Sequence, residues 1–140
     1  MRIGYLSADL HDHATMHLLA GVLQAHDRSR HAIHIYSYGP DIQDSYRKLA
    51  MENCEAFHDL RTLSDHAAAR QIADDGIDIL VDLKGYTRDS RLGISALRPA
   101  PVIVSAGLCG TIATRGKPLR APIIIATINA AMPAVVWTTM

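Results

Sequence analysis

The sequence predicts an α/β fold, a Rossmann-like doubly wound parallel sheet, and three observations predict it. Apolar runs of strand length alternate with helical patterns along most of the chain. The connections between them are short, which favours parallel strands joined by right-handed helical crossovers. With 140 residues, 49% of them apolar, and a formal net charge of zero, the chain is long enough for one domain with its own core.

Each expected strand and helix has its own signal in the sequence. Strands are expected where apolar or alternating residues run for a few positions, at 2–7, 31–38, 56–60, 77–83 and 101–105. Helices are expected at 15–25, 45–53, 67–73 and 90–97. The third helix has the clearest limits, because Ser64 offers a cap and Gly76 a stop.

The same patterns predict which faces are buried. The sheet-facing stripe of the first helix is expected to consist of Leu18, Leu19, Val22 and Leu23. In the strand at 31–38, Ile33 and Ile35 alternate with His34 and Tyr36 on the other side. This alternation predicts a strand with one less buried face.

The pattern deteriorates after Ser105. We therefore divide the chain into a Rossmann-like domain at 1–105 and a degenerate or poorly packed tail at 106–140. Prolines interrupt any long element in the tail, and the apolar run at 123–125 has no helical partner to cover it. The tail is expected to expose an unpaired edge and to lower the solubility of the whole chain.

Composition and targeting signals exclude several classes of protein. The balanced charge leaves no basic field to attract nucleic acid. Prolines and Asn129 break the apolar stretch at 121–136, which is too short for a membrane span. No secretory signal precedes the first strand, and Cys54 and Cys109 have no paired spacing or metal motif. A cytoplasmic protein with reduced thiols and no membrane anchor is expected.

Titratable side chains crowd the turn after the first strand, namely Asp9, His11, Asp12, His13 and His17. Open α/β sheets bind ligands at the carboxyl ends of their strands, where this turn is expected. A histidine beside a carboxylate can exchange a proton near neutral pH, and the following helix N-terminus attracts phosphates. A solvated histidine-rich loop stays an alternative. A metal site on His13 and His17 ranks low, because no glutamate or third ligand accompanies them.

A second polar group, DLKGYT, follows the most β-prone strand. Gly85 lets a ligand approach the backbone closely. The hydroxyls of Tyr86 and Thr87 can bond sugar or phosphate oxygens, and Lys84 can neutralise a phosphate. A plain strand-to-helix turn stays the alternative. The chain has no G-x-G-x-x-G fingerprint and no P-loop.

Three stretches together resemble the amino-terminal catalytic lobe of the protein O-GlcNAc transferase family, which includes the SPINDLY-like glycosyltransferases. They are RIGYLSADLHDHATMHLL, HDRSRHAIHIYSYGPD and IADDGIDILVDLKGYTRDSRLGISALRPAPVIVS. The resemblance covers roughly residues 2–105, and its motifs are more specific together than alone. It implies that the chain is a single lobe of a two-lobe B-type glycosyltransferase.

The resemblance also implies roles for individual residues. His13 matches the family histidine near the sugar donor and acceptor, and it is the expected catalytic residue. The loop after the central strand matches the loop where acceptor and donor meet, although Lys84 departs from the asparagine often found there. The residues expected to bind substrate are His17, Lys84, Gly85, Tyr86 and Thr87.

The family reaction transfers GlcNAc from UDP-GlcNAc, or fucose from GDP-fucose in the SPINDLY branch, to protein serine and threonine hydroxyls with inversion. The resemblance thus implies a protein or peptide acceptor, with no metal and no cofactor. Family members hold the nucleotide sugar mainly through a second lobe, and tetratricopeptide repeats usually precede the catalytic region. Neither has a counterpart in this sequence. A fragment that is inactive alone is expected, and a non-catalytic binding module stays the alternative.

Overall fold

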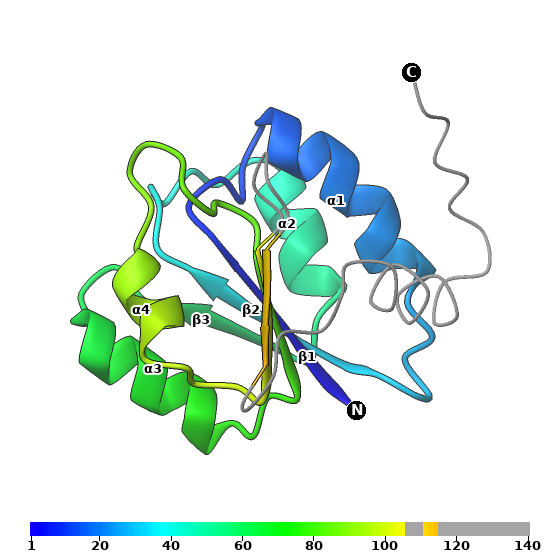
Figure 1. Ribbon diagram of the computed structural model, residues 1–140. Helices are drawn as coiled ribbons and strands as arrows, with labels where there is room; N and C mark the ends of the chain where they lie inside the picture. The colour runs from blue at the N-terminus through cyan, green and yellow to red at the C-terminus, as the bar shows by residue number, and fades with distance from the viewer. Residues whose placement is uncertain (106–110, 115–140) are drawn as a thin grey trace.

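The computed structural model describes residues 1–105 and 111–114, which form a sheet with helices on both faces (Figure 1). The strands are β1 (Arg2–Ser7), β2 (Ala32–Ser37), β3 (Ala56–Asp59), β4 (Ile79–Asp82), β5 (Val102–Ser105) and β6 (Thr111–Thr114). The helices are α1 (Ala14–Ala25), α2 (Ser45–Glu52), α3 (Asp65–Asp74) and α4 (Leu92–Ala96). The alternation of strands and helices predicted for the first 105 residues is confirmed, with small shifts at the ends of the elements.

The order of the strands is that of a doubly wound sheet. It runs β3-β2-β1-β4-β5-β6, with the first five strands parallel and β6 antiparallel to β5. From β1 the chain adds β2 and β3 on one side, and it then returns to add β4 and β5 on the other side of β1. As a result, α1 and α2 cover one face of the sheet, while α3 and α4 cover the other (Figure 1). The carboxyl ends of β1 and β4 mark the switch point at which such sheets bind ligands.

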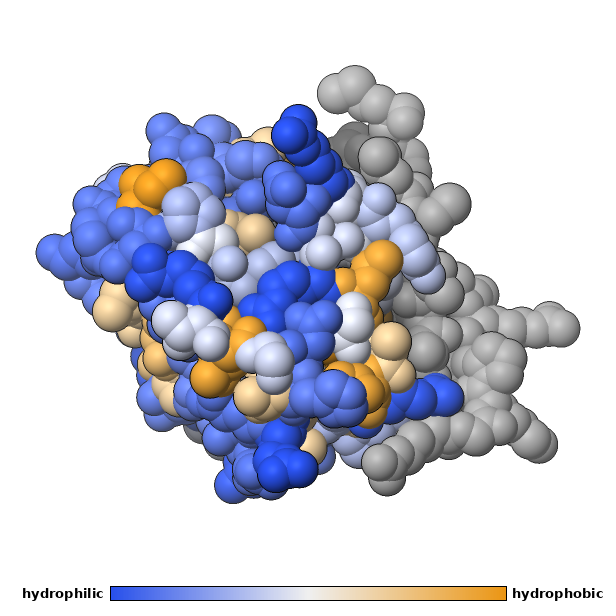
Figure 2. All heavy atoms as spheres, turned by 90° about the vertical axis from the view of Figure 1, so that its left-hand side faces the viewer, coloured by the Kyte–Doolittle hydropathy of each residue, from blue (hydrophilic) through white to orange (hydrophobic). Residues whose placement is uncertain are grey.

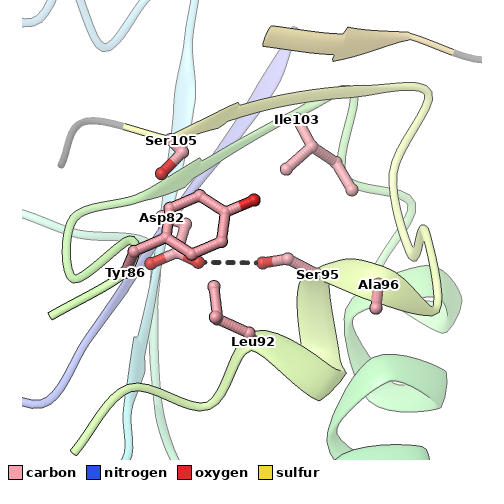
Figure 3. A pocket seen from close by; sticks show the side chains of 7 residues that line it. All are labelled: Asp82, Tyr86, Leu92, Ser95, Ala96, Ile103 and Ser105. Atoms are coloured by element: carbon pink, nitrogen blue, oxygen red, sulfur yellow. Dashed lines mark hydrogen bonds between the residues drawn. The ribbon is translucent and has the colours of Figure 1, made fainter. Parts of the chain in front are cut away.

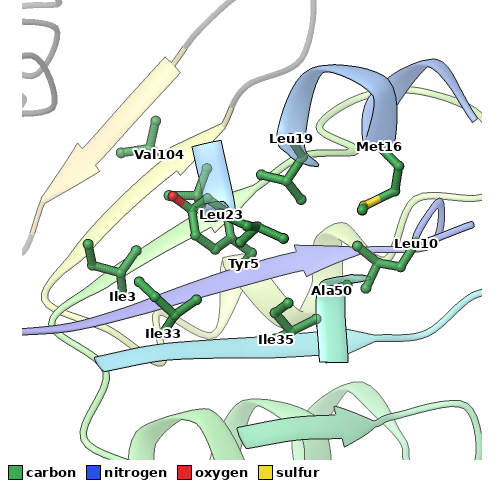
Figure 4. Close-up of a cluster of buried hydrophobic side chains, with 11 residues drawn as sticks. Ile3, Tyr5, Leu10, Met16, Leu19, Leu23, Ile33, Ile35, Ala50 and Val104 are labelled. Atoms are coloured by element: carbon green, nitrogen blue, oxygen red, sulfur yellow. The ribbon is translucent and has the colours of Figure 1, made fainter. Parts of the chain in front are cut away.

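Apolar side chains fill both faces of the sheet. Tyr5 and Ile35 pack with Met16 of α1 on one face (Figure 4). On the other face, Leu6 packs with Ile72 of α3. Successive residues of a strand point to opposite faces, so β1 contributes to both clusters. Burial on both faces explains why the sequence of β1 is continuously apolar at its centre.

Of two expectations about burial, one is wrong and one is confirmed. Leu18 is 74% exposed, and the buried residues of α1 are Met16, Leu19 and Leu23. Their spacing of three and four defines the stripe that meets the sheet, and Leu18 lies outside it. The second face of β2 is the less buried one, as expected: His34 and Tyr38 are half-buried, whereas the residues of the first face are buried. Tyr36 is the exception on this face, at 0% exposed. Side chains of α3 pack with Tyr36 and exclude solvent from it.

Part of the segment after Ser105 belongs to the sheet. β6 pairs with β5 from Val102↔Thr114 to Ser105↔Thr111. Residues 106–110 and 115–140 lie outside the described residues, so the expected poor packing of the tail stays a prediction. Among the described residues, Cys54 is a free thiol, and no helix is long and apolar enough to cross a membrane.

Candidate functional site

The two polar groups singled out in the sequence meet at the carboxyl edge of the sheet. Leu6 of β1 is paired with Asp82 of β4, and the Leu83 amide donates a hydrogen bond to the Leu6 carbonyl at 3.0 Å. The loops that follow these strands therefore start side by side. We call residues 8–13 and 83–90 the carboxyl-edge site. Figure 2 views the left-hand side of Figure 1, where hydrophilic side chains gather around the centre of the face.

An ion pair joins the two loops. Lys84 Nζ lies 2.8 Å from Asp9 Oδ2 and 3.1 Å from Asp9 Oδ1. The Lys84 and Asp9 side chains are only 14% and 12% exposed. The Asp9 amide also donates to the Ser7 hydroxyl at 3.0 Å, which fixes the start of its loop. Lys84 therefore links the two loops in this structure. Because the Asp9 carboxylate neutralises its charge, Lys84 is not a free cation for a phosphate.

His13 caps the N-terminus of α1. Its Nδ1 atom accepts a hydrogen bond from the Thr15 amide at 3.1 Å, and the Thr15 hydroxyl lies 3.1 Å from the same atom. Since an amide can only donate, Nδ1 carries no proton, and the neutral ring carries its proton on Nε2. Asp9 Oδ2 is 3.9 Å from Nδ1, too far for a hydrogen bond. The side chain is 42% exposed, and no described residue is hydrogen-bonded to Nε2.

His17 belongs to a different set of contacts. Its Nε2 atom lies 2.7 Å from Asp12 Oδ1, and its ring centroid is 4.9 Å from that of Tyr46 on α2. The Asp12 amide donates to Asp44, the N-cap of α2, at 2.6 Å. These contacts connect the start of α1 to α2, and none of them reaches the loop after β4. Within the described residues, His13 and His17 belong to no group of three possible metal ligands.

Asp82 shapes the loop after β4. Its buried carboxylate accepts hydrogen bonds from the Lys84 and Gly85 amides through Oδ1, and from the Ser95 hydroxyl through Oδ2, all at 3.0 Å. Gly85 has a φ of +53°, a left-handed conformation that favours glycine. The Thr87 hydroxyl donates to the Lys84 carbonyl at 2.8 Å. Gly85 and Thr87 therefore serve the turn itself, whatever ligand the loop also binds.

A cavity of about 220 Å³ opens beside this loop. Its lining is Asp82, Tyr86, Leu92, Ser95, Ala96, Ile103 and Ser105. Tyr86 points into it from the loop although the residue is 76% exposed, and the hydrogen bond between Asp82 and Ser95 lies in its wall (Figure 3). The Ser105 hydroxyl is buried without a hydrogen-bond partner among the described residues. The sequence does not indicate Ser95 and Ser105, because a lone serine on a helix or at a strand end carries no motif.

Comparisons with known proteins agree with this architecture. The family described as "Glycosyl transferase family 41" matches residues 1–134. A UDP-N-acetylglucosamine–peptide N-acetylglucosaminyltransferase of Caenorhabditis elegans is 41% identical over 105 residues, which are 74% of this chain and 9% of that protein. A solved structure of a mutant O-GlcNAc transferase of Thermobaculum terrenum matches with a TM-score of 0.73 and 35% identity, over 77% of this chain and 21% of that chain. The chain thus spans a small part of the length of these relatives.

Proposed function

This chain belongs to glycosyl transferase family 41, and from that premise we propose that it forms the amino-terminal catalytic lobe of a protein O-GlcNAc transferase. The donor we propose is UDP-GlcNAc, and the acceptor is a serine or threonine hydroxyl of a protein or peptide. The name of the Caenorhabditis elegans relative supports this pair of substrates. GDP-fucose is the alternative donor, since the resemblance extends to the SPINDLY-like branch.

One observation carries the proposal: Asp9, in the loop after β1, forms an ion pair with Lys84, in the loop after β4, at the switch point of the sheet. It is 2.8 Å from Lys84 Nζ and 3.9 Å from His13 Nδ1. Asp9 thus connects the loop that carries Tyr86 and Thr87 to the N-terminus of α1, where His13 is the cap. Partial positive charge at the helix end favours the phosphates of a nucleotide sugar. An imidazole, two hydroxyls and an anion-binding helix end suit the reacting groups of sugar transfer.

The tautomer of His13 favours a donor role over that of a general base. A base would need a free lone pair on Nε2, and the neutral ring would then carry its proton on Nδ1. That proton would remove the hydrogen bond from the Thr15 amide at 3.1 Å. With the proton on Nε2, the 42% exposed ring can instead donate to an oxygen of the acceptor or the donor. We therefore assign to His13 the orientation or polarisation of the reacting groups.

In the reaction we propose, the acceptor oxygen attacks the anomeric carbon from the face opposite the nucleotide. The new C–O bond forms as the bond to the diphosphate breaks, UDP leaves with the bonding electrons, and the configuration inverts. The proton of the acceptor hydroxyl passes to a diphosphate oxygen or to water. Tyr86 and Thr87 line the acceptor and sugar side, and no metal or cofactor takes part. The nucleotide is held mainly by a second lobe, and tetratricopeptide repeats are the expected partners of the whole enzyme.

We expect no turnover from this chain alone, because it covers 21% of the solved relative and the second lobe holds most of the nucleotide. A non-catalytic binding module is the second candidate. The ion pair between Lys84 and Asp9 favours it, since this pairing leaves the lysine charge unavailable to an incoming phosphate. The two candidates differ in whether the lobe supports chemistry once a second lobe is present.

A chimaera distinguishes the candidates. Residues 1–105 replace the matching lobe of the Thermobaculum terrenum enzyme, and transfer from UDP-GlcNAc or GDP-fucose to a serine-rich peptide is measured. We expect GlcNAc transfer, a loss of at least about 100-fold for His13→Ala, and no change for His66→Ala on the exposed side of α3. A chimaera that binds UDP without transferring sugar would favour the binding module. Transfer unaffected by His13→Ala would contradict the role of this residue.

A further inference from the structure

A second group of titratable side chains lies apart from the carboxyl-edge site. His34 on β2, His58 on β3 and Asp75 at the C-cap of α3 each offer one ligand atom, and these atoms lie within 4.8 Å of one another. We propose that this His34–His58–Asp75 cluster binds a divalent transition-metal ion, with zinc as the best match to two imidazoles and one carboxylate. The sequence predicts no metal ligands, because positions 34, 58 and 75 are far apart and form no spacing motif.

Strand register brings the two histidines together. Tyr36 of β2 is paired with His58 of β3, and His34 lies two residues before Tyr36 on the same face of the sheet. The three rings stack nearly parallel. The His34 and His58 centroids are 5.9 Å apart at an interplanar angle of 10°, and those of Tyr36 and His58 are 4.8 Å apart at 11°. Asp75 approaches from α3, with its Oδ2 atom 3.4 Å from His58 Nε2.

Two nitrogen atoms of the cluster lack hydrogen-bond partners. His34 Nδ1 and His58 Nε2 are buried, and neither makes a hydrogen bond within the described residues. Buried polar atoms are normally satisfied, so such atoms point to a ligand or an ion that completes them. Two imidazoles, one carboxylate and a water make up a common four-coordinate zinc site.

Neighbouring side chains can orient the ligands. Gln71 Nε2 lies 2.7 Å from His58 Nδ1, and the Tyr36 hydroxyl donates to Asp75 Oδ2 at 2.6 Å. Rotating the Gln71 amide by half a turn presents its carbonyl oxygen to His58 Nδ1–H, which leaves the Nε2 lone pair for the metal. Hydrogen bonds of this kind from the second ring nitrogen and to the carboxylate are typical around protein-bound zinc.

The cluster is accessible to an ion and a water molecule. The side chains of His58 and Asp75 are 19% and 24% exposed, so the site is half-buried and keeps some contact with solvent. A bound ion would join β3, which is the edge strand of the sheet, to β2 and to the end of α3. Metal binding to the folded state alone stabilises that state by mass action. We therefore expect zinc to raise the unfolding temperature of the protein.

The test uses the full chain after removal of metal with EDTA. Zinc uptake is followed by calorimetry, and cobalt uptake by the visible absorption of four-coordinate cobalt. We expect tight uptake of one ion. His34→Gln and His58→Gln should each lower the affinity at least about 10-fold, and Gln71→Leu should lower it about 10-fold. His66→Gln, a histidine on the exposed side of α3, is the matched control and should bind as the parent does.

His11 and His17, near the start of α1, are an alternative pair of zinc ligands, and a second control addresses them. Uptake that persists in His58→Gln and disappears in the double variant His11→Gln/His17→Gln overturns the proposal, as does the absence of uptake by the parent. Circular dichroism shows whether each variant is folded. Should a cluster variant not fold, NMR of the cobalt-loaded parent decides: paramagnetic shifts of the His34 and His58 ring signals support the proposal, and their absence contradicts it.

Discussion

His13 and His17 are four residues apart at the start of α1 and make separate contacts, whereas His34 and His58 come from separate strands and converge. His13 caps its own helix, while His17 pairs with Asp12 and packs on α2. His34, His58 and Asp75 come from three elements and place their ligand atoms within 4.8 Å. His13 has the extended backbone of an N-cap and turns its ring to its own helix end, so it does not share a helix face with His17. Strand pairing, in contrast, brings residues that are distant in the sequence to one point. Histidines that lie close together in the sequence therefore do not show which side chains meet in the structure.

The largest effect on the free energy of unfolding is expected for His26, a buried histidine with one hydrogen-bond partner among the described residues. His26 is 8% exposed, its Nε2 atom lies 2.7 Å from the Tyr5 hydroxyl, and burial lowers its pKa to about 4. The unfolded chain, with a histidine pKa of about 6.5, takes up the proton first as the pH falls. Stability from His26 is thus complete above pH 6.5 and is lost down to pH 4, by up to about 3 kcal/mol.

Urea unfolding at several pH values checks this expectation. His26→Gln cannot titrate, so its free energy of unfolding should fall less than that of the parent between pH 6.5 and pH 4. Parallel pH profiles for the two proteins would show that this histidine is protonated in the folded state as readily as in the unfolded one.

Breaking the ion pair between Asp9 and Lys84 should give the next largest loss in the free energy of unfolding. Asp9→Asn leaves the Lys84 charge in a place where the side chain is only 14% exposed. We expect a loss of about 2 kcal/mol, less than the roughly 3–5 kcal/mol for breaking a fully buried pair, because both side chains keep some contact with solvent. The double variant Asp9→Asn/Lys84→Met should recover part of it, because no unpaired charge remains. Equal stability of parent and single variant in urea would mean that water solvates the pair.

Two variants of His13 separate its role as the cap of α1 from its role in sugar transfer. His13→Ala removes the acceptor for the Thr15 amide and should cost about 1 kcal/mol, whereas His13→Asn offers a new capping oxygen and should cost less. Thermal unfolding measures both. Alanine offers no donor, and the shorter asparagine side chain does not reach as far as imidazole Nε2, so both variants should lose at least about 100-fold of the transfer in the chimaera. A His13→Asn variant with full transfer would show that the cap alone is required.

His17 should show the smallest effect. Its side chain and that of Asp12 are 52% and 71% exposed, and exposed ion pairs contribute little. We expect His17→Gln to change the free energy of unfolding by less than about 0.5 kcal/mol in urea. A loss above about 1 kcal/mol would indicate that the contact with Tyr46 holds α2 in place.

The fold is predictable from the sequence because its signals are periodic and local. Buried strands, helix caps and stops mark the elements of 1–105, and adjacency of β1 and β4 follows from doubly wound topology. The candidate site is predictable only in part. That Asp9 binds Lys84, or that His13 turns Nδ1 back to its own helix, depends on side-chain directions that no motif records. The exposed position of Leu18 has the same cause, since a small rotation of α1 decides which leucines are buried.

Both oxygens of the Asp82 carboxylate are occupied by the Lys84 and Gly85 amides and the Ser95 hydroxyl. The backbone of the loop after β4 is thus ordered before any ligand arrives. A sugar or peptide that meets Tyr86 has little chain to immobilise, so the conformational entropy lost on binding is small. Binding of a ligand to this loop is accordingly close to rigid docking. We expect the association rate to be set by encounter and orientation, not by the closing of a lid.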